Sequence, residues 1–215
     1  MIDNFRPRVV INPSPTPPTP TWNLLYNWDF TVSLIDSEQN EPLDVDSGYT
    51  RDSDGLSATY FNFPISLLEP GYAVELYFGD TSFAYTDSVP QLIYVDGAVD
   101  TIGFFTNASP FSSTPWSLQC GNNYTQVIQG DEDSFANSTL RIETSETQNN
   151  NPIWTIYKNG TLICTTPEYG QDGTTPFFTY SKYDPTDVLT TVCSGWAEQS
   201  DSRIAAFKIY QKTIS

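Results

Sequence analysis

The dipeptide Asn159-Gly160 separates two short runs of alternating residues, IWTIYK and TLICTT, and it constrains the fold more than any other feature of the sequence. Asn and Gly both accept the positive φ angles of a type I′ turn, whose twist matches the twist of paired strands. The pattern therefore predicts a β-hairpin at this point. Asp96-Gly97, which follows QLIYV, is a weaker signal of the same kind.

Comparable runs recur from Trp22 to the end of the sequence, separated by clusters of Gly, Pro, Asn and Asp. Strands spaced in this way are typical of an all-β sandwich or barrel. In Leu140–Glu143 and Trp154–Lys158 every second residue is apolar and the residues between them are mostly polar. This alternation predicts a sheet with one face in water. No long segment keeps a helical period, so we expect little helix beyond one turn at Ile65–Leu68. The candidate strands are NLLYNWDF, SATYFNF, AVELYFG, QLIYVDG, DTIGFFT, WSLQCG, TQVIQG, STLRIET, IWTIYKN, TLICTT, FFTYSKY, VLTTVCSG and SRIAAFKIYQK.

Residues 1–21 are predicted to form an extended arm, and residues 22–215 a single β domain, because β-sandwiches of this length are common as one unit. The prolines between Pro7 and Pro20 fix φ and remove backbone donors, so this segment cannot enter the middle of a sheet or helix. Its preferred conformation is polyproline II. We predict that the arm lies on a neighbouring subunit; docking on its own domain and a flexible tail are the alternatives. The predicted contact residues are Phe5, Arg6, Arg8, Val9, Val10 and Ile11.

A net charge of −17, from 26 acidic and nine basic residues, limits the classes of partner. A field of this sign repels phosphate groups, which argues against nucleic acid and against insertion into or binding to an anionic membrane. The sequence has no apolar run long enough for a membrane span, and its N-terminus lacks the pattern of a secretion signal. We expect the protein either to work inside the cell that makes it or to leave by lysis or assembly. Cys120, Cys164 and Cys193 are expected to be free thiols.

Two segments resemble the laminin-G-like and concanavalin A-like family of jelly rolls. In that family a strand ends in aromatic-x-Asn-Gly before its hairpin partner, as at Tyr157–Gly160, and the last strand has the form I-x-x-(F/V)-x-I-Y, as at Ile204–Tyr210. Leu25–Phe30 is similar to the first strand of the family. The resemblance covers residues 22–215 and implies an antiparallel jelly-roll sandwich. The family includes lectins, hydrolases and structural modules, and similar domains occur in the virions of tailed bacteriophages, so the fold leaves the function open.

Catalysis is not expected, because the chain has no histidine. This excludes Ser-His-Asp triads, Cys-His dyads and His-ligated metal sites. The sandwich glucanases of the family use a Glu-x-Asp-x-x-Glu strand. Neither Asp131–Asp133 nor Glu41–Asp46 matches that pattern, and both lie in turn-like contexts. We therefore predict that the protein is not an enzyme.

Two kinds of binding site remain as candidates. Acidic residues gather between Asp36 and Asp54, and calcium prefers a shell of such oxygen ligands, although the order of an EF-hand is absent. A solvated loop is the alternative. A glycan site would use exposed aromatic rings near loops, which are otherwise core or interface residues. The candidate calcium ligands are Asp44, Asp46, Asp52 and Asp54, and the candidate glycan-binding residues are Trp116, Tyr124, Tyr169, Tyr180 and Trp196.

The leading functional hypothesis is a structural virion protein of a tailed bacteriophage, either a capsid decoration (cement) protein or a tail accessory. It would be made in the host cytoplasm without a signal peptide, form a homo-oligomer, and bind the major capsid protein or tail proteins through residues 1–21. The alternative is a lectin-like module that recognises a cell-surface glycan. No cofactor is expected apart from the candidate structural calcium ion.

Overall fold

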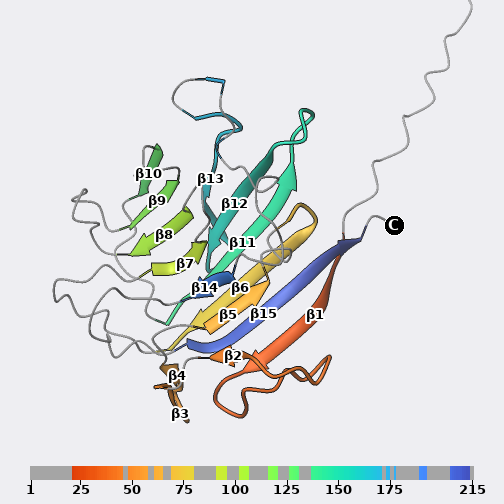
Figure 1. The fold of residues 1–215 in the computed structure, drawn as a ribbon, viewed down its shortest axis with the longest axis vertical. Helices are drawn as coiled ribbons and strands as arrows, with labels where there is room; N and C mark the ends of the chain where they lie inside the picture. Colours follow the sequence, from red (N-terminus) through yellow and green to blue (C-terminus); the bar gives the residue numbers. More distant parts are fainter. Residues whose placement is uncertain are drawn as a thin grey trace, which may run out of the picture.

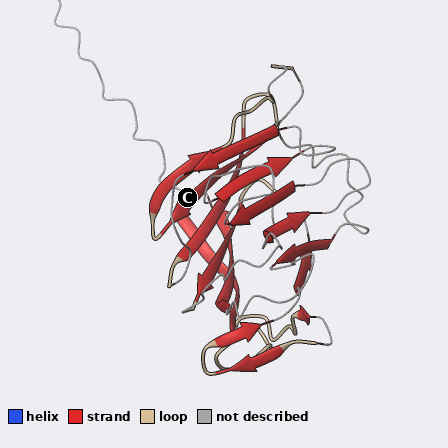
Figure 2. Cartoon of the chain, turned by 90° about the vertical axis from the view of Figure 1, so that its left-hand side faces the viewer, coloured by secondary structure: helices blue, strands red, loops and turns tan. Residues whose placement is uncertain are grey.

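The computed structural model describes residues 21–45, 48–57, 61–64, 69–79, 91–95, 102–106, 116–120, 126–130, 137–170, 173–174, 177, 189–192 and 204–213. All the predicted contact residues of the arm, the predicted turn at 65–68 and most of the predicted strand FFTYSKY lie outside these residues. Within the described part every regular element is a strand, as Figure 2 shows. No helix long and apolar enough to cross a membrane occurs among the residues described.

The strands form two sheets, and every described pairing is antiparallel. The first sheet has the order β13 (Thr161–Thr165), β12 (Pro152–Lys158), β11 (Thr139–Glu146), β6 (Tyr72–Phe78), β15 (Ile204–Thr213), β4 (Gly55–Ser57) and β3 (Thr50–Asp52), and β1 (Thr21–Asp29) also pairs with β15. The second has the order β10 (Gln126–Gly130), β9 (Trp116–Cys120), β8 (Ile102–Thr106), β7 (Gln91–Val95), β14 (Leu189–Val192), β5 (Phe61–Pro64) and β2 (Asp44–Val45).

The chain passes between the two sheets repeatedly, as expected of a jelly roll. Strands β2, β5, β7–β10 and β14 of the second sheet are interleaved in sequence with those of the first. As a result β6 lies between β11 and β15, which are far from it in sequence (Figure 1). The prediction of an all-β, antiparallel jelly-roll sandwich is confirmed.

The predicted alternation of apolar and polar residues is confirmed in the first sheet. Val74 and Leu76 on β6, Ile142 on β11, Ile156 on β12 and Phe207 on β15 are all buried, and they alternate along their strands with more polar neighbours. Burying a side chain of this size stabilises the fold by about 1.5–3 kcal/mol. These residues form the core side of the first sheet. We call the opposite side its open face.

The pairing of β1 with β15 joins the first and last described strands. A register shift between Leu24 and Tyr26 interrupts the pairing, and such a bulge changes which side chains face the core. Tyr26 stacks on Trp28 with 5.2 Å between ring centroids, and Trp28 stacks on buried Phe207 at 5.5 Å. Leu24, before the shift, is 39% exposed. Because of the bulge, the aromatic residues Tyr26 and Trp28 face the core, whereas Leu24, before the bulge, faces outward.

The hairpin predicted at Asn159-Gly160 is confirmed. Lys158 pairs with Thr161, and the two turn residues have φ angles of 50° and 76°. Asn159 also accepts the backbone N–H of Thr139 through its side-chain oxygen at 2.8 Å, which ties the turn to β11. At the second candidate, β7 and β8 pair as neighbours, and their pairing closes at Val95 and Ile102. The dipeptide Asp96-Gly97 itself lies outside the described residues.

The segment between residues 44 and 64 differs from the prediction. It was expected to contain an acidic loop followed by one strand, SATYFNF. Instead β3 and β4 form a tight hairpin in the first sheet, with Asp52 opposite Gly55, and β5 begins at Phe61 in the second sheet. The predicted strand SATYFNF is therefore confirmed only from Phe61 onward, in β5; its first residue, Ser57, ends β4 in the other sheet, and residues 58–60 lie outside the described part. Strands as short and polar as β3 carry too few residues for alternation to reveal them.

Candidate functional site

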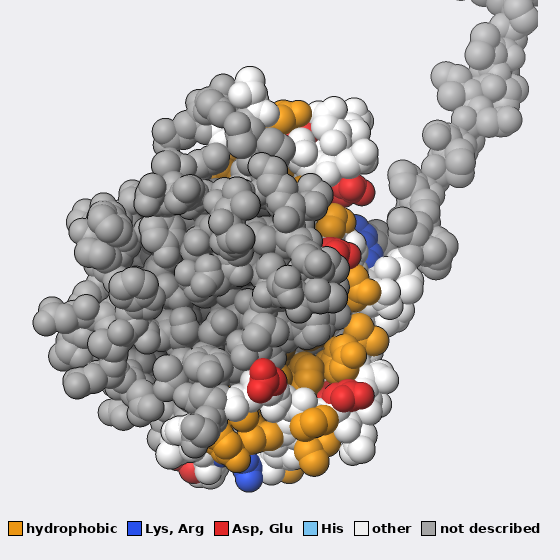
Figure 3. Space-filling view, in the orientation of Figure 1, with side chains coloured by type: hydrophobic (Ala, Val, Ile, Leu, Met, Phe, Trp, Pro, Cys, Tyr) orange, Lys and Arg blue, Asp and Glu red, His pale blue; other side chains and the backbone are white. Residues whose placement is uncertain are grey.

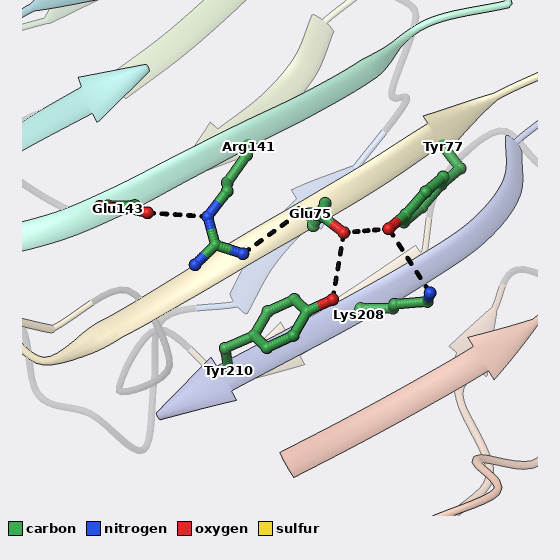
Figure 4. Close-up of polar contacts among 6 residues, drawn as sticks. All are labelled: Glu75, Tyr77, Arg141, Glu143, Lys208 and Tyr210. Atoms are coloured by element: carbon green, nitrogen blue, oxygen red, sulfur yellow. Dashed lines mark hydrogen bonds and ion pairs between the residues drawn. The ribbon is translucent and has the colours of Figure 1, made fainter. Parts of the chain in front are cut away.

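Charged and aromatic side chains gather on the open face of the first sheet, where strand register brings them into rows. Arg141 on β11 is opposite Glu75 on β6, and Glu75 is in turn opposite Lys208 on β15. Arg141 is also opposite Tyr157 on β12. Because direct partners on one face have Cβ atoms about 5 Å apart, these side chains are within reach of one another. We call Glu75, Tyr77, Arg141, Glu143, Lys208 and Tyr210 the open-face cluster (Figure 4).

Glu75 is the centre of the open-face cluster. Its Oε2 lies 3.2 Å from Nη1 of Arg141, while its Oε1 accepts hydrogen bonds from the hydroxyls of Tyr77 and Tyr210, the latter at 3.1 Å. The residue is only 9% exposed, although it lies on the face opposite the core. A carboxylate covered to this extent needs such donors, because burying it without partners would cost several kcal/mol. The three donors therefore make this covered charge tolerable.

The cations of the open face lie against aromatic rings. Cζ of Arg141 is 5.1 Å from the ring centroid of Trp22 and 4.7 Å from that of Tyr210, and its Nε is 2.8 Å from Oε1 of Glu143. Nζ of Lys208 is 4.5 Å from the ring centroid of Tyr77. Attraction between a cation and the electron-rich ring face favours these positions. The rings therefore hold the cationic groups in place over the sheet.

The tyrosines of the open-face cluster are donors rather than bases. Burial, together with the hydrogen bond to Glu75, raises the pKa of Tyr77 far above its ordinary value. Burial and the charge of Glu75 also raise the pKa of Tyr210. Burial alone would lower the pKa of Arg141, but the hydrogen bonds to Glu143 and Glu75 outweigh it and raise that pKa. A general base needs a pKa near the working pH, so neither tyrosine suits that role.

A second polar group lies at the β11–β12 turn and after β13. Oε1 of Glu168 accepts hydrogen bonds from Oγ1 of Thr147 at 2.8 Å and from Nδ2 of Asn149 and Asn151 at 2.8 and 3.0 Å. Asn149 Nδ2 also donates to the hydroxyl oxygen of Tyr169 at 3.2 Å. We call these five residues the Glu168 cluster. The hydrogen bonds from Asn149 and Thr147 lower the pKa of Glu168, so its carboxylate is ionised at neutral pH.

Local structure explains how these residues meet. The turn after β11 closes through backbone hydrogen bonds from Thr147 N to Asn151 O at 3.0 Å and from Asn150 N to Thr147 O at 3.1 Å. Asn150 has a φ of 60°, a conformation that asparagine tolerates better than most residues. The β12–β13 hairpin then returns the chain, so that Glu168 arrives beside this turn. An Asn-rich turn and a distant Glu-Tyr pair are thereby brought together.

Tyr169 is the one predicted glycan-binding residue whose surroundings are described. Trp116 is in β9, but its side chain lies outside the described part, and the other three candidates, Tyr124, Tyr180 and Trp196, lie wholly outside it. Tyr169 is half-buried and next to amide and carboxylate groups. Its role in glycan binding stays a prediction.

The candidate calcium ligands are in separate places among the residues described. Asp44 is in β2 of the second sheet, whereas Asp52 and Asp54 are at the β3–β4 turn of the first; Asp46 lies outside the described residues. Asp52 Oδ1 accepts the backbone N–H of Asp54 at 2.9 Å, which stabilises that turn. Within the described ranges, no group of three or more His, Cys, Asp or Glu residues could hold a metal ion.

Asp36, at the start of the same acidic stretch, is a structural residue. It is 2% exposed, and its two carboxylate oxygens accept hydrogen bonds from the backbone N–H groups of Asn27, Glu38 and Gln39. The bond from Glu38 is 3.1 Å long. These bonds tie the end of β1 to the turn that follows residue 36. At least one acidic residue of this stretch, Asp36, thus has a structural role.

The sequence reasoning missed Glu75, Arg141 and Glu168. A signal existed for Glu75, since it is the one charged residue within the strand YAVELYF. Arg141 was recognised only as a polar position in an alternating strand. Glu168 carried no local signal, because its partners are 17–21 positions earlier in the sequence.

No protein-family model matches the chain, and no curated protein matches it. Among solved structures, the metal-free carbohydrate recognition domain of Emp46p is 12% identical, with a TM-score of 0.46, over 85% of this chain and 97% of that one. Rv0315 of Mycobacterium tuberculosis, described as a pseudo β-1,3-glucanase, is 9% identical, with a TM-score of 0.49, over 88% of this chain and 90% of that one. Alginate lyase Aly36B is 10% identical, with a TM-score of 0.34, over 80% and 77%. Similarity at this level does not identify binding residues.

The virion hypothesis stays a prediction. The residues expected to anchor the arm lie outside the described part of the chain, and none of the three structures named above is described as a virion protein. The predicted homo-oligomer and the predicted capsid or tail partners are likewise untested.

Proposed function

We propose that this protein is a carbohydrate-binding module without catalytic activity, and that it recognises a glycan through the Glu168 cluster. The observation that carries the proposal is the placement of an ionised, surface carboxylate among Thr147, Asn149 and Asn151, with the hydroxyl of Tyr169 in contact with the same group. Sugars offer pairs of hydroxyl groups and one apolar ring face. A site that combines fixed hydrogen-bonding groups with an aromatic ring can bind both the hydroxyl groups and the apolar ring face.

The hydrogen bonds of the cluster leave groups available for a ligand. Thr147, Asn149 and Asn151 all donate to Oε1 of Glu168, so none of these three bonds occupies Oε2, and the hydroxyl of Tyr169 also interacts with the carboxylate. An ionised carboxylate oxygen is a strong acceptor for sugar hydroxyls. Because neighbouring side chains already fix the orientation of this carboxylate, binding costs less conformational entropy than it would at a mobile group.

A glycan microarray tests the proposal with the full-length protein and matched variants. We expect specific binding by the wild type, loss of binding in Tyr169→Ala, and weaker binding in Glu168→Gln, which keeps the shape of the side chain but removes its charge. Tyr169→Phe distinguishes the two functions of the tyrosine, since it keeps the ring and removes only the hydroxyl.

Tyr49→Ala is the matched control, because Tyr49 is a 41% exposed tyrosine outside the Glu168 cluster. It should bind like the wild type. Absence of specific glycan binding by the wild type, or binding that Tyr169→Ala leaves intact, would contradict the proposal.

A further inference from the structure

The hydrogen bonds within the Glu168 cluster engage most of its donors. Oγ1 of Thr147 and Nδ2 of Asn151 donate to Oε1 of Glu168 at 2.8 and 3.0 Å. Nδ2 of Asn149 donates to the same oxygen at 2.8 Å and to the hydroxyl oxygen of Tyr169 at 3.2 Å, so both N–H groups of this amide are engaged. The hydroxyl of Tyr169 in turn interacts with the Glu168 carboxylate. These bonds leave one side-chain N–H of Asn151 as the remaining donor.

The groups that stay available to a ligand are mainly acceptors. An ionised carboxylate can only accept hydrogen bonds, so Asn149 and Asn151 must turn their amide nitrogens toward Glu168. Their amide oxygens lie on the other branch of each amide group, and neither accepts a hydrogen bond from a residue that the structure describes. Asn149 is exposed and Asn151 is half-buried. The site therefore offers two amide oxygens and the carboxylate, but hardly any donor.

The cluster also carries a negative charge that no described cation neutralises. In the part of the chain that the structure describes, the ion pairs join Arg141 to Glu75 and Glu143, and Glu168 takes part in none. At the top of Figure 3, where Figure 1 places the β11–β12 turn, the described surface is mostly uncharged polar groups and shows no Lys or Arg. The whole chain carries −17. The electrostatic field at the cluster therefore favours a cationic ligand over a neutral or anionic one.

Sugar substituents differ in how well they match an anionic site made of acceptors. An ammonium group has three donors, no acceptor and a positive charge. A hydroxyl group has one donor, and its lone pairs would find hardly any donor in this site. The carbonyl oxygen of an acetamido group also needs a donor, and the carboxylate of a uronic acid would be repelled. The free amino group of a hexosamine is therefore the substituent that fits the cluster best.

We propose that the Glu168 cluster binds a glycan with free, protonated amino groups, that is, a hexosamine polymer without its N-acetyl groups. The ammonium group donates to the carboxylate of Glu168 and to the amide oxygen of Asn149, and charge-assisted hydrogen bonds of this kind are roughly twice as strong as neutral ones. The inference rests on the proposed carbohydrate-binding function, in which the ring of Tyr169 contacts the sugar.

Titration calorimetry with a short glucosamine oligomer tests the inference, and the N-acetylated oligomer of the same length is the matched ligand without charge. The two ligands share sugar ring and linkage, so the comparison isolates the amino groups. At a pH below the pKa of the sugar amine, the wild-type protein should bind the glucosamine oligomer about tenfold more tightly. Raising the pH above that pKa should reduce the preference, because the deprotonated amine has lost its charge.

Glu168→Gln keeps the shape of the side chain and removes its charge. It should weaken binding of the glucosamine oligomer about tenfold and change binding of the N-acetylated oligomer much less. Glu38→Gln is the control for net charge, since Glu38 is an exposed residue of the turn after β1. It should change the affinity less than Glu168→Gln does. Thermal unfolding of each variant establishes that the fold is intact.

The inference is overturned if the wild type binds neither oligomer, if it binds the N-acetylated oligomer as tightly as the glucosamine oligomer, or if Glu38→Gln weakens binding as much as Glu168→Gln. Any of these results leaves the proposed function intact when a glycan on the microarray binds specifically and Tyr169→Ala abolishes that binding. If no glycan binds to the wild type, the proposed function fails, and this inference fails with it.

Discussion

Glu75 and Arg141 are direct cross-strand partners on β6 and β11, and their side chains form an ion pair of 3.2 Å on the open face of the first sheet. The pair is not isolated, because Glu75 also accepts two tyrosine hydroxyls and Arg141 also binds Glu143. Residues from three neighbouring strands thus depend on one carboxylate. The stability of this face should therefore be sensitive to Glu75.

Replacing Glu75 by Gln should lower the free energy of unfolding by about 2–3 kcal/mol, because Arg141 then loses an ionic partner in a half-buried setting. Urea unfolding followed by tryptophan fluorescence measures the change. Glu146→Gln, at the exposed end of β11, is the control and should change stability by less than about 0.5 kcal/mol. A value for Glu75→Gln as small as the control would show that the cluster contributes nothing to stability.

Stability should fall at alkaline pH because of Tyr77 and Tyr210. Their pKa values are raised above the ordinary value of 10.0, so the folded state holds the phenolic protons more tightly than the unfolded state does. The resulting stabilisation is complete below pH 10.0 and is lost as the pH rises above it. Urea midpoints measured between about pH 8 and pH 11 follow this loss. Tyr77→Phe should show a shallower decline than the wild type, and an identical decline would contradict the assignment.

Asp36→Ala should destabilise the protein by about 2–3 kcal/mol, because the backbone N–H groups of Asn27, Glu38 and Gln39 lose their common acceptor. Asp36→Asn retains one acceptor oxygen and should cost less. Thermal denaturation of the two variants gives the order of their effects. Equal melting temperatures for wild type and Asp36→Ala would mean that water replaces the carboxylate without cost.

Gly55→Ala should be more damaging than Gly160→Ala, although both glycines have positive φ. At Gly55, with a φ of 124°, an added methyl group would collide with the backbone carbonyl of Ile204, which pairs β4 with β15. At Gly160, with a φ of 76°, the space is open, so only the conformational cost of about 1 kcal/mol applies. Denaturant unfolding of the two variants checks the order, and an equal effect would contradict it.

The parts of the fold that could be predicted were those set by local pattern. The Asn159-Gly160 turn and the alternation in β11 and β12 depend on residues close together in sequence, where conformational preference is decisive. The open-face cluster joins Glu75 to Arg141 and Tyr210, which are 66 and 135 positions away. Such contacts depend on strand order and register, which a single sequence does not specify. Tyr169 was identified as an aromatic residue near a loop. The involvement of Glu168 became apparent only from the structure, in which the β12–β13 hairpin brings this residue beside the turn after β11.

Thr21 and Thr213 are register partners on β1 and β15, so the two ends of the described chain lie side by side and could be joined in a circular permutant. Neighbouring strands are about 4.8 Å apart, so a short glycine linker would span the two positions. A circular permutant that joins them and opens the chain at the Asn159-Gly160 turn keeps every described strand pairing of the first sheet, because neither turn residue is a register partner in the pairings of β12 with β11 and β13. New termini would then emerge beside β11 instead of beside β1.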